Sequence, residues 1–137
     1  GKIFISVRKS DRLPAVEIAR KLAELGFTLY ATRGTASALF EAGLEVIPVN
    51  KVTEGRPHIV DMIKNNEISL IINTVGDKRS AVQDSYSIRH AVLQARVTYF
   101  TTLAGARAAC IGMANIRELK VYDLQKLHKL IESELPH

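Results

Sequence analysis

Residues 46–63 read Val-Ile-Pro-Val-Asn-Lys-Val-Thr-Glu-Gly-Arg-Pro-His-Ile-Val-Asp-Met-Ile, and they contain the pattern of a strand followed by that of a helix. Its first apolar run predicts a strand that ends at Val49, and the apolar spacing at its end predicts a helix. Lys51 therefore follows the carboxyl end of a strand, and Arg56 and His58 stand where the next helix begins. Helix N–H groups and loop side chains converge at that edge of an α/β sheet, so the stretch predicts a ligand site there.

The rest of the chain repeats this alternation of strand and helix. Short runs rich in apolar and β-branched residues predict strands over residues 3–7, 27–31, 45–49, 68–73 and 97–100, with a further short run at 119–121. Helical spacing predicts helices over residues 10–25, 35–42, 57–66, 84–95, 103–114 and 123–134. Such alternation is typical of a three-layer α/β fold, in which helices cover both faces of a parallel sheet.

Local signals add detail to the helix boundaries. Ser10 and Asp11 are candidates for capping the first helix, while Gly26 and Gly43 are expected to end the first and second helices. Residues 74–83 contain a glycine and several charges, and they are predicted to form a surface loop over the strand edge.

The composition limits the classes of protein that fit. The chain has 137 residues, of which 47% are hydrophobic and 24% charged, so we expect one ordinary domain spanning residues 1–137. The net charge is +5, but the basic residues are scattered, without a basic block or an aromatic RNA-binding signature. No apolar run is long enough to cross a bilayer. We therefore expect neither a nucleic-acid partner nor a membrane.

Two further features concern the cellular context. The single cysteine, Cys110, is expected to be a buried thiol in a reducing compartment, which favours the cytoplasm. The sequence starts at Gly1 without a methionine and enters a strand almost at once. We therefore expect this domain to have been excised from a longer multidomain chain.

Polar residues at a second strand end suit an anionic ligand. Thr32 and Thr35 flank Gly34 between a strand and a helix, where hydroxyls and helix N–H groups can bind phosphate oxygens. Lys51 can supply a point charge, and Arg12, at the start of the first helix, can reach the same phosphate. Each residue also has a plain structural interpretation, with Thr35 as a helix cap and the two cations as solvated surface residues.

A third strand end carries Asn73 and Thr74, which leave an otherwise apolar strand abruptly. These side chains can hydrogen-bond a base or a ribose, and the alternative is a turn that satisfies its own backbone. The chain has no metal-ligand spacing, nucleophile elbow, Walker loop or dinucleotide-binding glycine motif. The residues alone therefore favour binding of a small phosphorylated molecule.

At these positions the chain resembles the methylglyoxal-synthase-like superfamily. Residues 26–27 and 31–36 resemble its Gly-Thr loop, and residues 49–59 are similar to one branch, the carboxyl-terminal allosteric domain of the carbamoyl phosphate synthetase large chain. Residues 71–74, 88–89, 99 and 101–103 resemble that branch too, so the match covers nearly the whole chain. The resemblance implies a five-stranded parallel Rossmann-like sheet, in a domain that regulates catalysis elsewhere in a longer chain.

The resemblance also implies a nucleotide effector, with uridine monophosphate as inhibitor and inosine monophosphate as activator. Its phosphate would be held by Arg12, Thr32, Thr35 and Lys51, although the family more often has Lys at the first of these positions. Asn73 and Thr74 would meet the ribose and base, and the rest of the pocket would be lined by Ser6, Val52, Ile59 and Ser85. Val75 stands where bacterial members carry a further Thr, so the preference between the two nucleotides stays open.

The parent protein implied by the resemblance is a glutamine-hydrolysing, ATP-dependent ligase that serves the pyrimidine and arginine pathways. No cofactor is expected in this domain, because ATP, Mg²⁺ and K⁺ would bind to other domains of the parent chain. The expected partners are those domains and a glutaminase small subunit. The family's ornithine site uses a Tyr-Asp-Thr run, of which Tyr99 and Thr101 form a remnant here. Phe100 replaces the carboxylate that would pair with the ornithine ammonium, so we expect no response to ornithine through this site.

The main alternative is a lyase of the methylglyoxal synthase type, which eliminates phosphate from dihydroxyacetone phosphate and needs a carboxylate base. Arg56 stands where that family places its aspartate, and a guanidinium cannot accept a proton at neutral pH. Glu54 is the nearest replacement. A third candidate, the cyclohydrolase domain of purine synthesis, shares the fold, but its lysine-based site finds no match. We therefore favour a regulatory domain without catalytic residues.

Overall fold

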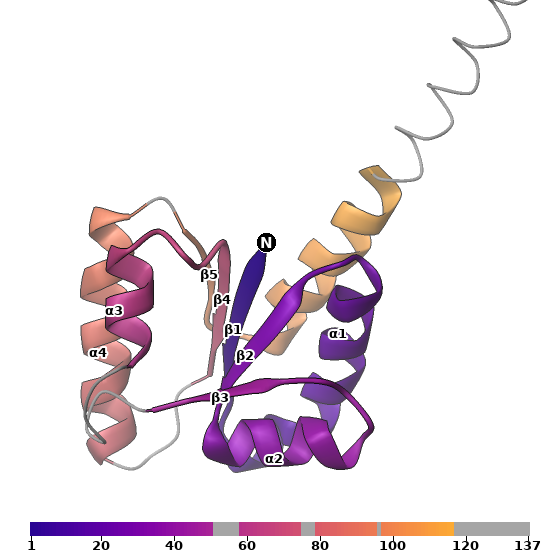
Figure 1. Ribbon diagram of the computed structural model, residues 1–137, viewed down its shortest axis with the longest axis horizontal. Coiled ribbons are helices and arrows are strands. Elements are labelled where there is room, and N and C mark those ends of the chain that lie inside the picture. The colour runs from indigo at the N-terminus through magenta and orange to yellow at the C-terminus, as the bar shows by residue number, and fades with distance from the viewer. Residues whose placement is uncertain (51–57, 75–78, 96, 117–137) are drawn as a thin grey trace, which may run out of the picture.

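A five-stranded parallel sheet forms the middle layer of the computed structural model (Figure 1). The structure describes residues 1–50, 58–74, 79–95 and 97–116, with the backbone alone for residues 79–85. The strands are β1 (Lys2–Ser6), β2 (Thr28–Thr32), β3 (Ile47–Val49), β4 (Leu70–Asn73) and β5 (Thr98–Phe100). They lie in the order β3-β2-β1-β4-β5, and each neighbouring pair is parallel. The predicted fold class and its five main strands are confirmed.

Strand β1 lies at the centre of the sheet, and its three middle side chains are buried. Ile3, Phe4 and Ile5 are exposed to no more than 1%. A strand that is covered on both faces needs this kind of continuous apolar run. Because successive side chains alternate, Ile3 and Ile5 join the apolar cluster on one face, and Phe4 joins the cluster on the other.

Helices cover the two faces of the sheet unequally (Figure 1). One face packs against α1 (Arg12–Glu24), α2 (Arg33–Glu41) and a helix over residues 103–116, whose apolar residues join one cluster. The other face packs against α3 (Ile59–Lys64) and α4 (Arg79–Gln94), which contribute Ile63 and Ile88 to the second cluster. None of the described helices combines the length and the apolar character that a membrane span requires.

Glycine ends the first two helices, as predicted. Gly26 and Gly43 follow α1 and α2 with φ angles of +94° and +85°. A side chain is strained in this left-handed region, so glycine is the residue that lets the chain turn towards the next strand. The predicted strand 119–121 and helix 123–134 lie outside the described residues.

Three predicted helix starts are wrong in detail. A short 3₁₀ turn, η1 (Lys9–Asp11), precedes α1, so Ser10 is not the cap, and the Asp11 side chain makes no capping bond. Helix α2 begins at Arg33, which places Thr35 inside the helix and not at its cap. Helix α4 begins at Arg79, so the second half of the expected loop over residues 74–83 is helical. Those residues carry too few apolar positions to show a helical period.

Cys110 is buried, as expected, with 2% of its surface exposed in the cluster beneath α1 and α2. Burial raises the pKa of its thiol, and the positive charge of Lys21 opposes that shift only in part. The reactive thiolate is therefore suppressed at neutral pH, which suits a packing role.

Candidate functional site

The strand order reverses between β1 and β4, and the carboxyl ends of these two strands lie side by side. Ser6, at the end of β1, pairs in register with Asn73, at the end of β4. Thr74 then donates its N–H to the Ser6 carbonyl at 2.9 Å, and its hydroxyl accepts the N–H of Arg8 at 2.9 Å. Open α/β sheets bind ligands outside the strand ends at such a reversal. Three predicted site residues therefore meet at the expected edge.

Three hydroxyl side chains gather on the β2 side of this edge. The Thr32 hydroxyl lies 3.3 Å from the hydroxyl oxygens of Ser6 and Thr35. The Thr35 hydroxyl also accepts the N–H of Val7 at 3.1 Å, and Thr35 is only 1% exposed. Thr35 therefore anchors the start of α2 to the residue that follows β1, in place of the capping role that the sequence left open.

Arg12, at the start of α1, extends across to the start of α2. A Cβ atom placed on Gly34 would overlap a terminal nitrogen of the Arg12 guanidinium and would lie 3.0 Å from its Cζ atom. The guanidinium thus lies against the backbone of the Gly-Thr loop. Its Nε atom is buried and has no hydrogen-bond partner among the described residues. A buried cationic N–H without an acceptor is unfavourable, and an anion bound here would satisfy it.

Asn73 is held from the neighbouring strand β5. Its side-chain Nδ2 donates to the Tyr99 hydroxyl at 3.0 Å, and Asn73 itself is 5% exposed. Tyr99 packs against the cluster under α3 and α4, whereas Phe100 packs on the opposite face, close to Gly105. Thr101 follows the strand and is exposed. Of the two residues assigned to the ornithine-site remnant, Tyr99 is therefore turned towards Asn73.

Of the remaining predicted site residues, the structure describes the side chain of Ile59 alone. Ile59 begins α3 and is 1% exposed within the apolar cluster, so its side chain fills the core. Lys51 and Val52 lie outside the described residues, and Ser85 belongs to α4 with its side chain undescribed.

Sequence reasoning missed three contacts between the end of β3 and the starts of α2 and α3. Arg33 donates to the Asn50 side-chain oxygen at 3.1 Å, which links the start of α2 to the residue after β3. His58 forms a backbone bridge with Asn50, and the His58 N–H donates to the Asp61 carboxylate at 3.4 Å. An acidic residue three positions after the residue that precedes a helix is a capping signal, and it could have predicted the contact between His58 and Asp61.

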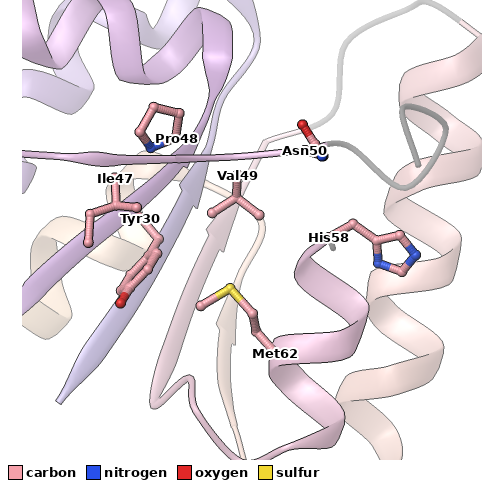
Figure 2. Close-up of a pocket in the computed structure, with 7 residues that line it drawn as sticks. All are labelled: Tyr30, Ile47, Pro48, Val49, Asn50, His58 and Met62. Atoms are coloured by element: carbon pink, nitrogen blue, oxygen red, sulfur yellow. The ribbon is translucent and has the colours of Figure 1, made fainter. Parts of the chain in front are cut away.

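A separate pocket of about 200 Å³ opens beside β3 (Figure 2). It is lined by Tyr30, Ile47, Pro48, Val49, Asn50, His58 and Met62. The imidazole of His58 points away from Tyr30 and Met62 (Figure 2). The described lining of this pocket is mostly apolar and includes none of the residues predicted to bind phosphate, ribose or base, so we do not assign the nucleotide to it.

The side chains at this strand edge have the chemistry that suits an anion. None of these side chains is a base at neutral pH. They are the hydroxyls of Ser6, Thr32, Thr35 and Thr74, the carboxamide of Asn73 and the guanidinium of Arg12. Among the residues that the structure describes, no three His, Cys, Asp or Glu side chains gather so that they could hold a metal ion. Hydroxyl, amide and guanidinium donors suit phosphate oxygens.

Comparisons of the sequence with known proteins all point to the same family. A model of the MGS-like domain matches residues 14–101. The chain is 56% identical over 128 residues to the carbamoyl phosphate synthase large chain of Ralstonia nicotianae, and 51% identical over 133 residues to that of Xanthomonas axonopodis. These matches cover 93% and 97% of this chain, but the chain spans only 12% of either relative.

A solved structure supports the fold independently. Methylglyoxal synthase of Elizabethkingia anophelis superposes with a TM-score of 0.63 over 80% of this chain and 76% of that protein. The sequence identity of 20% means that this likeness concerns the fold alone. The family match, the carbamoyl phosphate synthase relatives and the shared fold lead to one conclusion: the chain belongs to the MGS-like domain family.

Proposed function

We propose that this chain is a regulatory domain that binds a nucleoside monophosphate, with uridine and inosine monophosphates as the expected effectors. The observation that carries the proposal is the guanidinium of Arg12, which lies against Gly34 and whose buried Nε has no hydrogen-bond partner among the described residues. Gly34 lies between Thr32 and Thr35 in the chain, and the hydroxyls of these two threonines contact each other. This group supplies positive charge and hydrogen-bond donors for a phosphate. We assign Lys51 to the same phosphate from its place in the sequence.

The nucleoside part is assigned to the other half of the edge. Asn73 ends β4 next to Ser6, and Thr74 follows it, at the reversal of strand order where open α/β sheets bind nucleotides. The Asn73 carboxamide can hydrogen-bond a base or a ribose hydroxyl. From the family we add Val52, Ile59 and Ser85 to this side of the pocket, although the burial of Ile59 limits it to a supporting contact.

The parent protein is proposed to be the large chain of carbamoyl phosphate synthase, because the relatives at 48–56% identity are such large chains. The domain would have no catalytic residue and would tune, from the cytoplasm, the synthesis of carbamoyl phosphate for the pyrimidine and arginine pathways. The chain's other domains and a glutaminase subunit would be its partners, and ATP, Mg²⁺ and K⁺ would bind to those other domains. An allosteric coupling of about 1–3 kcal/mol would be typical, and it would be reciprocal between effector and substrate.

Titration calorimetry of the whole 137-residue chain tests this function. We expect at least one of the two nucleoside monophosphates to bind, and uridine and inosine to bind more weakly by roughly tenfold or more, because they lack the phosphate. If neither monophosphate binds, or if the nucleosides bind equally well, the proposal is wrong.

A Gly34→Ala substitution separates binding from stability. The added methyl group would push the Arg12 guanidinium off the loop, so we expect nucleotide affinity to fall about three- to tenfold. Gly34 lies inside helix α2, where alanine is favoured over glycine, so the free energy of unfolding should not decrease. Calorimetry and urea unfolding of the same preparation measure the two effects.

Gly112→Ala is the matched control for that experiment. Gly112 also lies in a helix, and a Cβ atom placed on it would meet nothing within 4 Å. We expect this variant to keep its affinity for the nucleotide. An equal loss of affinity in both variants would contradict a specific role for the contact between Arg12 and Gly34.

The lyase alternative finds less support. The structural likeness to methylglyoxal synthase is at 20% identity, whereas the carbamoyl phosphate synthase relatives are at least 48% identical. The described residues gathered at the strand edge also lack the carboxylate that proton abstraction requires. Arg56 and Glu54, which bear on that mechanism, lie outside the described residues. We therefore propose binding and not catalysis for this domain.

A further inference from the structure

We propose that Tyr99 is a positioning residue whose hydroxyl holds the Asn73 carboxamide and so sets the affinity for the nucleoside half of the ligand. The inference rests on the proposed function and extends it to a residue that would not itself touch the phosphate. It assigns Tyr99 to the nucleotide site, beyond the ornithine-site remnant that the resemblance implied. The bond that carries it runs from Asn73 Nδ2 to the Tyr99 hydroxyl at 3.0 Å.

The tyrosine is well placed to act as a fixed point. It lies on β5 in register with Ile71 of β4, and its ring packs against the apolar cluster under α3 and α4. The ring therefore has little freedom, and the position of its hydroxyl follows from the sheet. Asn73, two residues further along β4, is 5% exposed and belongs to the strand end where the ligand is assigned.

A carboxamide needs such a fixed point in order to discriminate between ligands. Its terminal torsion is broad, and its oxygen and nitrogen have opposite hydrogen-bonding character. A group that may rotate presents a mixture of donor and acceptor to a ligand, whereas a held group presents one of them. The Tyr99 hydroxyl therefore helps to hold the Asn73 carboxamide in one orientation, which makes its contact with a ligand directional.

The two halves of the site should respond differently to this contact. Arg12, Thr32 and Thr35 belong to α1, β2 and α2, on the far side of Ser6 from β5. In the described part of the chain, the side-chain hydrogen bonds of Thr32 and Thr35 run to Ser6, to Val7 and to each other, and none of them involves Tyr99. Loss of the tyrosine hydroxyl should weaken binding of the nucleoside part of the ligand and leave the phosphate contacts unchanged.

The test compares Tyr99→Phe with the unaltered full chain by titration calorimetry, with uridine and inosine monophosphates and with inorganic phosphate as probes. We expect the variant to bind the nucleotide about three- to tenfold more weakly, as loss of one neutral hydrogen bond implies. The affinity for inorganic phosphate should stay the same. In an Asn73→Ala background, the Tyr99→Phe change should have no further effect, because the group that it positions is gone.

Tyr86→Phe is the matched control, since Tyr86 lies on α4 with 76% of its surface exposed. It should bind all probes like the unaltered chain. Unchanged nucleotide affinity in Tyr99→Phe would overturn the inference, and so would a parallel loss of nucleotide and phosphate affinity, which indicates general damage to the site. If the unaltered chain binds no nucleotide, the proposed function itself fails, and this inference fails with it.

Discussion

Replacing Arg12 by Ala is expected to weaken binding of a nucleoside monophosphate by roughly ten- to a hundredfold, because hydrogen bonds to a charged group contribute about 1.5–3 kcal/mol. The guanidinium lies against Gly34, and its buried Nε lacks a partner among the described residues. The free energy of unfolding should stay the same or rise slightly, since the substitution removes an unsatisfied group. Titration calorimetry and urea unfolding measure the two quantities separately.

Arg8→Ala provides the control for charge. Arg8 lies between β1 and α1, four residues before Arg12. Its guanidinium pairs with the Asp11 carboxylate at 2.7 Å, and its side chain is 52% exposed. Its removal changes the net charge equally and should alter affinity by no more than about twofold, because exposed charges are screened by solvent and salt. Arg12→Lys should fall between the unaltered chain and Arg12→Ala, since it keeps the charge but loses the planar fork. Equal losses in Arg8→Ala and Arg12→Ala would mean that only overall charge matters.

Replacing Thr35 by Val is expected to lower both stability and affinity. The two side chains have a similar shape, but valine cannot accept the N–H of Val7, which the Thr35 hydroxyl now does at 3.1 Å. Because Thr35 is 1% exposed, water cannot replace that acceptor, and the free energy of unfolding should fall by about 1–3 kcal/mol. Nucleotide affinity should fall as well, since the hydroxyl beside Thr32 is lost. Urea unfolding followed by calorimetry in the absence of denaturant tests both effects.

Two variants show whether the hydroxyl of Thr35 is responsible. Thr28→Val makes the same chemical change at an exposed position at the start of β2, and it should leave stability and affinity unchanged. Thr35→Ser keeps the hydroxyl and loses one buried methyl group, so it should retain most of the affinity of the unaltered chain. A Thr35→Val variant as stable as the unaltered chain would show that the bond to Val7 does not contribute to folding.

The layers of the fold could be predicted because they depend on local patterns. An uninterrupted apolar run such as Ile3-Phe4-Ile5 suits a strand that is covered on both faces, and the apolar spacing from Ala15 to Leu22 suits a helix with one buried side. Glycines at 26 and 43 marked the helix ends for an equally local reason, namely the backbone angles that they adopt. Where the pattern was weak, as in residues 79–83, the prediction failed and a helical turn was taken for a loop.

The α/β class of this protein and the polar residues at its strand ends could be predicted from the sequence, because strand ends and helix starts depend on neighbouring residues. The contacts among those polar residues followed from the tertiary structure. The Arg12 guanidinium lies against Gly34, and the Thr35 hydroxyl accepts the N–H of Val7. The Ile59 side chain is buried in the core, and the Asn73 carboxamide donates to the Tyr99 hydroxyl. These contacts join segments distant in the chain, and they depend on strand order, strand register and the rotation of each helix on the sheet, which no local pattern specifies.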